Sequence, residues 1–508
     1  MKAWKISGTL GFALLLCVGS AMAQSQDPRQ GMPPIDPNAP LQPLDTTTGG
    51  PSQPAPNRPP IGAARGVDAP FDPQSYDPSQ VTPDPNTLAG AATFTLGSLQ
   101  HRVNIFDPGI SVSELGEFVP GLNGKTVTVG ETVATGSLNF SRTWSQYHFS
   151  TLYTGGETFN EGYGQAATFF GATPRHFQFH DLVAAQQIDW ARWHILLMDD
   201  FTASPGAAFS GQGMGGPGLA GEFSSMLGAS LTSLSQSFLP SENINTSLVM
   251  RLRNSVVAQA QYALSRRSSI TVAASYGFLH FDIPTLQNSE MINVQGGYDY
   301  QLDPSDSLGI LASYGKIDYT GTGRSTSEYG GALAYGRRIT GRLAFQIAAG
   351  PQEIRIIVPG GAGNFNLLFV SVNSALTYQR RRGGVSLNFV RGLNGGSGVF
   401  LGATSDTASG AAHYQFSRNW TGSINGGTSL NYNLAPAGVA RTKFYNWFAG
   451  ANVGRQLGQH ASFNLNYGAM EQNNPIGCTV AVCGGTGVEQ TVGVSLNWHL
   501  LPVRKEGR

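Results

Sequence analysis

The sequence predicts an all-β fold, and the first observation behind this prediction is a repeated alternation of side chains. From residue 104 to the end, segments of about ten residues or more alternate apolar with small or polar side chains. Successive side chains of a strand point to opposite faces. In the last segment, 491–500, Val, Leu and Trp share one face, while Thr, Gly, Ser, Asn and His share the other. One face of the sheet is therefore apolar and the other is polar.

Composition is the second observation. Charged residues make up 12% of the chain, about half of the roughly 25% typical of soluble domains. The mean hydropathy of −0.13 excludes a bundle of membrane helices. The formal net charge is zero, so no global field attracts nucleic acid. These values fit strands with one lipid-facing and one water-facing side. Together with the alternation, they predict a transmembrane antiparallel up-and-down β-barrel.

The region before the barrel divides into two segments. Residues 1–23 predict a secretory signal peptide, with Lys2 and Lys5 before an apolar run and Ala21-Met22-Ala23 as the cleavage site. Residues 24–100 are rich in Pro and poor in apolar side chains, so they predict a disordered periplasmic arm. This arm is either a spacer or a tether to a cell-wall or inner-membrane partner.

The barrel is expected over residues 101–501, with about 18 strands (about 16 as the alternative) and a tail at 502–508. Short turns alternate with longer connections, which places the short turns and both ends of the barrel in the periplasm. A long loop is expected after residue 116, through Lys125. The predicted strands are 104–116, 134–144, 147–156, 176–188, 191–203, 248–265, 269–282, 290–302, 307–320, 325–337, 341–356, 365–380, 384–395, 399–417, 420–432, 442–457, 460–472 and 488–500.

The apolar face requires the sheet to close. An unpaired backbone polar group costs several kcal/mol in hydrocarbon, so a lipid-facing sheet cannot keep a free edge. Aromatic residues near the predicted strand ends suit the girdles of such barrels. They are Trp144, Tyr147, Trp190, Trp193, Trp420, Tyr432, Trp447 and Trp498.

The last strand resembles the terminal insertion strand of bacterial outer-membrane β-barrels, and the whole barrel resembles porin-like members of that class. The resemblance implies a location in the outer membrane of a Gram-negative-type bacterium. It also implies contact with outer-membrane lipid and with the barrel-insertion machinery.

The polar face is expected to line the lumen. It is mostly uncharged and rich in amide and hydroxyl groups, which hydrogen-bond water and sugar hydroxyls without favouring either ion sign. The candidate lumen-lining residues are Arg251, Arg253, Gln259, Gln261, Asn293, Gln295, Asn373, His413, Asn464 and Asn466.

The longest connection, 204–247, has its own pattern. Its segment 211–216 matches GxGxxG, but no strand-helix unit surrounds it, so a nucleotide site is not expected. Apolar residues then recur at helical spacing. This helix either folds into the lumen or caps the rim. By resemblance to general porins, whose third outer loop folds inward, we expect a constriction formed by Leu219, Phe223, Leu227 and Leu231.

Two further features suggest chemistry. Cys478 and Cys483 predict a disulfide in an oxidising compartment, and a metal pair is the alternative. His180 is expected near Asp200, but no nucleophile motif accompanies the pair. His176 suits a polar rim better than a zinc site. We therefore expect no enzyme activity, no cofactor and no metal.

These observations predict a porin-like channel for passive diffusion of small polar, mostly neutral solutes, saccharides among them. Two alternatives remain open. One is a conduit for polysaccharide export, with a periplasmic partner docked on the arm. The other is a structural or adhesion barrel with a plugged lumen.

Overall fold

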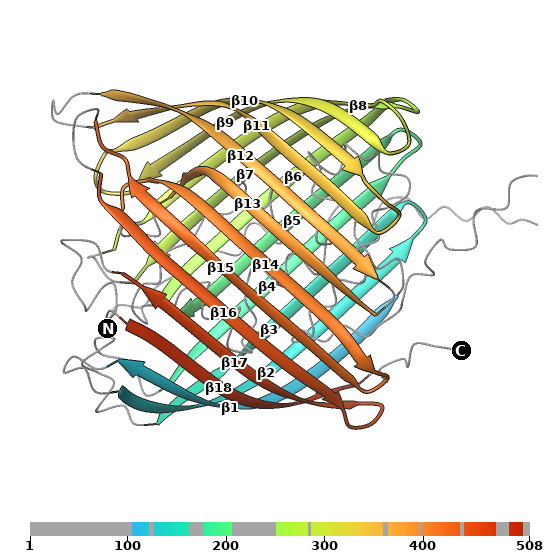
Figure 1. Ribbon diagram of the computed structural model, residues 1–508, viewed down its shortest axis with the longest axis vertical. Coiled ribbons are helices and arrows are strands. Elements are labelled where there is room, and N and C mark those ends of the chain that lie inside the picture. Colours follow the sequence, from blue (N-terminus) through green and yellow to red (C-terminus); the bar gives the residue numbers. More distant parts are fainter. Residues whose placement is uncertain are drawn as a thin grey trace, which may run out of the picture. The chain divides into compact units, whose positions relative to one another are not determined.

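The structure, a computed structural model, describes residues 104–120, 126–161, 176–205, 250–282, 286–358, 364–380, 382–395, 398, 400–436, 441–473 and 487–500. Within these residues the chain forms one antiparallel sheet of 18 strands (Figure 1). The last strand pairs with the first, which closes the sheet. The predicted all-β barrel is confirmed, with 18 strands rather than 16.

The strands follow one another around the barrel in chain order. They are β1 Ile105–Pro120, β2 Thr126–Trp144, β3 Tyr147–Glu161, β4 His176–Asp189, β5 Trp193–Pro205, β6 Met250–Ser265, β7 Ser268–Phe281, β8 Ser289–Gln301, β9 Asp306–Tyr319, β10 Ser325–Arg338, β11 Leu343–Ile357, β12 Phe365–Arg380, β13 Gly383–Asn394, β14 Ala403–Ser417, β15 Trp420–Asn433, β16 Lys443–Gln456, β17 Ala461–Gln472 and β18 Gly487–His499.

The register of the closing pair brings the two ends of the barrel sequence together. Gly109, near the start of β1, pairs with His499 at the end of β18, and Phe118 pairs with Gln490. The short turns, such as the one between β2 and β3, lie at the same end of the barrel as these two strand ends. Most predicted strands differ from the observed ones by only a few residues at either end.

The expected long loop between the first two strands is wrong. β1 continues to Pro120 and β2 already begins at Thr126. The alternation inverts in this region, which concealed the strands: Leu115 and Val129 are buried on the inner face. Glu114 lies on the outer face and accepts a hydrogen bond from the Thr132 hydroxyl of β2 at 2.7 Å. Pairing across the strands thus accommodates a carboxylate that the pattern of one strand disfavours.

The two faces of the sheet differ sharply in composition. On β17, the Leu465 side chain is 47% exposed while its neighbour Asn466 is 5% exposed. The short-turn end carries exposed tryptophans on the outer face: Trp144, Trp190, Trp193, Trp420 and Trp498. Two of them have an arginine guanidinium over the ring, Arg142 at 5.9 Å from Trp144 and Arg455 at 5.2 Å from Trp420. The predicted aromatic girdle is therefore present at this end.

The strand lengths suit a bilayer. A strand such as β18, with 13 residues, extends roughly 43 Å along the chain and about 30 Å along the barrel axis at a tilt near 45°. The outer face is apolar over this span, and a girdle of aromatic side chains borders it at the short-turn end. This pattern is typical of the outer surface of an outer-membrane barrel. The described residues contain no helix that is long and apolar enough to cross a membrane.

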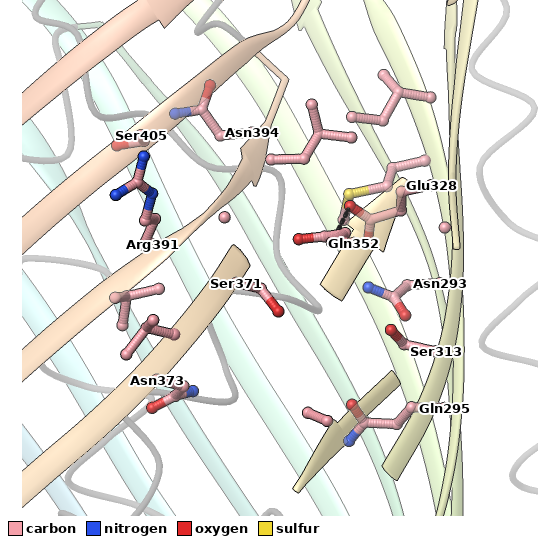
Figure 2. A pocket seen from close by; sticks show the side chains of 18 of the residues that line it. Asn293, Gln295, Ser313, Glu328, Gln352, Ser371, Asn373, Arg391, Asn394 and Ser405 are labelled. Carbon is pink, nitrogen blue, oxygen red and sulfur yellow. Dashed lines mark hydrogen bonds between the residues drawn. The ribbon is translucent and has the colours of Figure 1, made fainter. Parts of the chain in front are cut away.

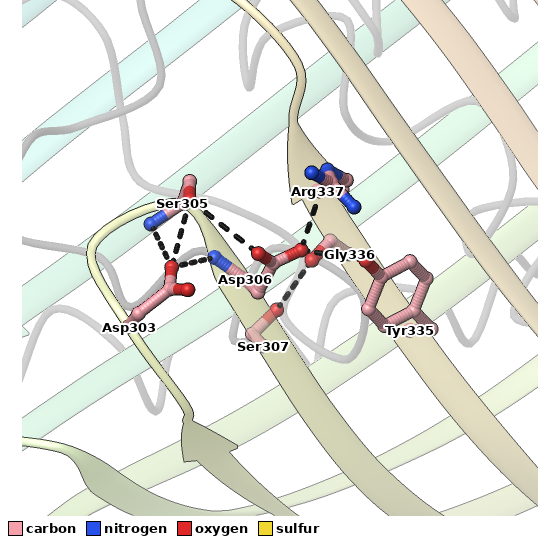
Figure 3. Close-up of polar contacts among 7 residues, drawn as sticks. All are labelled: Asp303, Ser305, Asp306, Ser307, Tyr335, Gly336 and Arg337. Atoms are coloured by element: carbon pink, nitrogen blue, oxygen red, sulfur yellow. Dashed lines mark hydrogen bonds and ion pairs between the residues drawn. The ribbon is translucent and has the colours of Figure 1, made fainter.

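The turn between β8 and β9 shows how one short turn is held (Figure 3). The Asp303 carboxylate accepts hydrogen bonds from the Ser305 hydroxyl (2.7 Å), the Ser305 backbone N–H (2.7 Å) and the Asp306 N–H (2.8 Å). These bonds, the one from the Ser305 hydroxyl foremost, hold the pKa of Asp303 below its usual range. The neighbouring strand β10 is held to this turn by the Tyr335 hydroxyl, which donates a hydrogen bond to the Asp306 carboxylate at 2.6 Å.

The difference between the faces predicts the effect of a charge on β17. Leu465→Arg places a charge against lipid near the middle of the strand, and we expect it to lower the free energy of unfolding by roughly 2–4 kcal/mol. Asn466→Arg faces inward and should cost much less. Urea unfolding of both variants in vesicles measures the difference. An equal loss in the two variants would show that the faces are wrongly assigned.

The expected orientation, with the short turns in the periplasm, predicts which ends of the strands are accessible from outside the cell. Thr320→Cys lies in the β9–β10 connection and should react with an impermeant thiol reagent on intact cells. Gln459→Cys lies in the short β16–β17 turn and should react only after the outer membrane is permeabilised. The unmodified chain supplies the background of its own cysteines. Labelling of Gln459→Cys on intact cells would reverse the orientation.

Candidate functional site on the inner wall

The predicted lumen-lining residues all lie on the inward face of their strands. On β8, Asn293 and Gln295 are buried while the flanking Ile292 and Val294 are exposed on the outside. The same alternation places the other residues inward: Arg251, Arg253, Gln259 and Gln261 on β6, Asn373 on β12, His413 on β14, and Asn464 and Asn466 on β17. That these side chains contact a passing solute stays a prediction.

A cavity of about 130 Å³ lies against this wall, between β8 and β14 (Figure 2). Three of the ten predicted residues line it, namely Asn293, Gln295 and Asn373. The other seven do not. Its polar lining also includes Ser371 and Thr407, which alternation likewise assigns to the inner face, and residues that the sequence did not single out: Ser313, Glu328, Gln352, Asn394 and Ser405. Amide and hydroxyl groups therefore dominate the polar part of the lining.

Glu328 is the main residue that the sequence analysis missed. It lies on the inner face of β10, and the Gln352 side-chain N–H on β11 donates a hydrogen bond to its carboxylate. Its side chain covers Gly315 of β9. A Cβ atom added to Gly315 would lie only 2.7 Å from Glu328 Cγ, so glycine leaves the space that the glutamate side chain occupies. The signal was present in the sequence, because Tyr329 and Leu333 mark the outward positions of this strand and thereby assign Glu328 to the other face.

Glu328 is the one inward-facing charged side chain among the described residues that line the cavity. Two cations also appear in the lining, but the strand register turns both side chains outward. Lys316 forms an ion pair with Asp318 at 2.7 Å, and Arg391 forms one with Asp406 at 3.4 Å. The cavity thus presents one carboxylate within a neutral polar surface.

A buried ion pair occupies a different part of the inner wall. Arg253 on β6 donates to Asp200 on β5 at 2.8 Å, and both side chains are almost fully buried. This pair replaces the expected proximity of His180 and Asp200, which is wrong. Asp200 pairs in register with Val183, whereas His180 pairs with Ala203 and points outward, where its Nδ1 lies 3.0 Å from the Tyr153 hydroxyl.

A second polar cluster lies on the inner face near the short turns. The Asp189 carboxylate is 2.6 Å from His194 Nδ1 and 3.3 Å from His148 Nε2, and it accepts a hydrogen bond from Gln187 at 2.7 Å. Within the residues that the structure describes, no group of three His, Cys, Asp or Glu side chains is placed to hold a metal ion.

Several expected features lie outside the described residues. They are the signal peptide, the arm at 24–100, the tail at 502–508, the constriction residues Leu219, Phe223, Leu227 and Leu231, and the cysteines Cys478 and Cys483. These remain predictions from the sequence.

Comparison with known proteins gives structural likenesses only. No protein-family model and no curated protein matches the sequence. Among solved structures, the outer membrane protein opdK from Pseudomonas aeruginosa is similar at 8% identity and a TM-score of 0.38, over 78% of this chain and 98% of that chain. P. aeruginosa OccK2 (OpdF) in complex with glucuronate is similar at 10% identity and 0.39, over 80% and 100%. A BenF-like porin from Pseudomonas fluorescens Pf-5 is similar at 9% and 0.38, over 78% and 98%.

The buried ion pair predicts an asymmetric response to mutation. Arg253→Met leaves the Asp200 carboxylate buried without its guanidinium partner, and we expect a loss of about 3 kcal/mol in the free energy of unfolding. Arg253→Met combined with Asp200→Asn should recover most of that loss. Urea unfolding of the two single variants and the double variant measures the coupling. Additive losses in the double variant would show that the two side chains do not stabilise each other.

Proposed function

We propose that the chain is a porin-like channel of the outer membrane, through which small polar, mostly neutral solutes diffuse passively. The observation that carries this proposal is the inner face of the closed barrel, where asparagine, glutamine, serine and threonine outnumber charged side chains. Such groups exchange hydrogen bonds with water and with the hydroxyls of sugars, and they give no strong preference for either ion sign.

The dimensions of the barrel support the proposal. Eighteen strands about 4.8 Å apart, tilted by roughly 40°, give a diameter of about 36 Å between opposite backbones. Barrels of 16–18 strands are wide enough for an aqueous channel. The remaining diameter depends on what the inward-facing side chains and any inserted loop occupy.

Some charged groups of the inner wall are compensated, whereas Glu117, Glu131 and Glu489 lie together there as like-charged neighbours. Arg253 is paired with Asp200, and Asp189 is shared between two histidines. These compensated groups contribute little net field, which suits weak ion selectivity in their part of the passage. As an outer-membrane channel, the chain would have outer-membrane lipid, the barrel-insertion machinery and small polar solutes or saccharides as its partners.

A polysaccharide export conduit is the second candidate. The same amide-rich wall would contact sugar hydroxyls along a polymer, and residues 24–100 would then dock a periplasmic partner. A plugged structural or adhesion barrel is the third. The position of the apolar stripe of residues 219–238 distinguishes a plugged barrel from an open channel. A stripe packed across the whole lumen would block passage, whereas a stripe packed against one side would only narrow the lumen.

Planar-bilayer recordings and liposome swelling test the channel. The purified chain should open a conductance with a reversal potential near zero in a salt gradient, and its liposomes should swell in neutral sugars. Deleting residues 219–238 should raise the single-channel conductance and leave the heat-modifiable gel mobility of the folded barrel unchanged. The double variant Phe223→Asp, Leu227→Asp should act in the same direction, because a charged stripe cannot dock on the wall.

Other outcomes would contradict these expectations. A folded deletion variant with unchanged conductance would place the segment over the rim instead of in the lumen. A wild-type chain without conductance that conducts after the deletion would be a plugged barrel. Sugar passage that requires residues 24–100 would favour the export conduit.

A further inference from the structure

We propose that the cavity on the inner wall between β8 and β14 binds a monosaccharide-sized polyol that carries a protonated amine. Glu328 would accept the ammonium group, and the side-chain amides of Gln295 and Gln352 would bind hydroxyls (Figure 2). This inference rests on the proposed function, because the solute must enter the lumen to reach the site.

Unpartnered polar atoms are the first reason. The Gln295 side chain is 5% exposed and its Nε2 has no hydrogen-bond partner, while Gln352 is 7% exposed and its Oε1 has none. A buried donor and a buried acceptor without partners cost free energy that a bound ligand recovers. Figure 2 shows the Gln295 and Gln352 side chains directed into the same space. A hydroxyl is the complementary group, since it donates and accepts at once.

The size of the cavity is the second reason. Its volume of about 130 Å³ is close to that of an engineered cavity of about 150 Å³ that admits one benzene ring. The six-membered ring of a monosaccharide therefore fits, with its hydroxyl substituents reaching the open side of the cavity toward the lumen, whereas a longer chain would lie mostly in the lumen. This size favours a monosaccharide over an oligosaccharide segment.

The backbone of the wall leaves room for the ligand. Glycines occupy inward positions at Gly315 and Gly330, next to Glu328 and Ser313. A Cβ at Gly330 would lie 2.6 Å from the Ser313 hydroxyl oxygen, and one at Gly315 would displace Glu328. Glycine weakens a strand interior and is used where another group approaches the backbone closely. Here it keeps the carboxylate against the wall and the space in front of it open.

Charge defines the ligand further. The carboxylate of Glu328 has one hydrogen bond from Gln352, and no cationic side chain lies on its face of the described lining. A charge-assisted bond to an ammonium group is stronger than a neutral hydrogen bond, and it strengthens where water is excluded. An anionic sugar would instead meet a carboxylate of the same sign. The site should therefore rank an amino sugar above a neutral sugar, and a neutral sugar above a sugar acid.

Glucosamine, glucose and glucuronate form a matched series for the test, since they share a ring and differ in charge. Calorimetry on the detergent-solubilised full chain at about pH 7, where most of the amine is protonated, should give affinities in the order glucosamine, glucose, glucuronate. Glu328→Gln should weaken glucosamine binding about tenfold or more and change glucose binding by less than about twofold. Gln295→Ala should weaken both sugars to a similar extent.

Glu353→Gln is the matched control. Glu353 neighbours Gln352 in sequence but points outward, where it accepts a hydrogen bond from Asn366 at 2.9 Å. This variant removes the same charge without touching the cavity, so it should leave all three affinities unchanged. Equal glucosamine binding by the wild type and a folded Glu328→Gln variant would overturn the proposal, as would glucuronate binding as tight as glucosamine. Gln295→Ala gives a second test if Glu328→Gln does not fold, and unchanged sugar binding there would also overturn it.

The two hypotheses fail separately. Calorimetry reads binding without requiring passage, whereas bilayer conductance reads passage without requiring a saturable site. Sugar permeation without glucosamine binding would contradict the site and leave the channel intact. Ranked binding without conductance would support the site and contradict the channel.

Discussion

The structure depends on one constraint: every backbone N–H and C=O group that faces hydrocarbon must be paired within the protein. The pairing of β1 with β18 meets this constraint by removing the last free edge of the sheet. Because the sheet is closed, each strand has a neighbour on both sides and only two environments remain for side chains. The apolar set faces lipid and the polar set faces inward, and the rim carries tryptophans that suit the boundary between them.

The inner wall follows from that division. Polar side chains on a closed inner face must pair with each other, with water or with a solute. On β5 and β6 they pair with each other, as Arg253 does with Asp200. On β8 and β11 some do not, and Gln295 and Gln352 keep buried atoms without partners beside a cavity. The wall therefore has a part where charged side chains pair with each other and a part where polar atoms lie without partners beside a cavity.

Features that one strand carries by itself could be predicted from the sequence, whereas features that depend on the contact of two strands could not. The ten candidate lumen residues were assigned to the inner face from alternation alone, and the strand register agrees for each. Glu114 and Thr132 concealed part of the first hairpin, because a hydrogen bond between neighbours lets a carboxylate occupy the outer face. The predicted proximity of His180 and Asp200 is wrong because the two side chains point to opposite faces of the sheet. The pairing of Val183 with Asp200 shows this.

The sequence by itself determined the two faces of each strand, the requirement for closure and the strand number to within about two, because these depend on a period of two and on the solvation of the backbone. Only the tertiary structure decided which inward residues meet. Glu328, Gln352 and Gln295 come from three different strands, and their convergence depends on the register between β8, β9, β10 and β11. Alternation within a strand carries no information about the offset between strands. The cavity, and the carboxylate within it, could therefore be recognised only once the barrel was assembled.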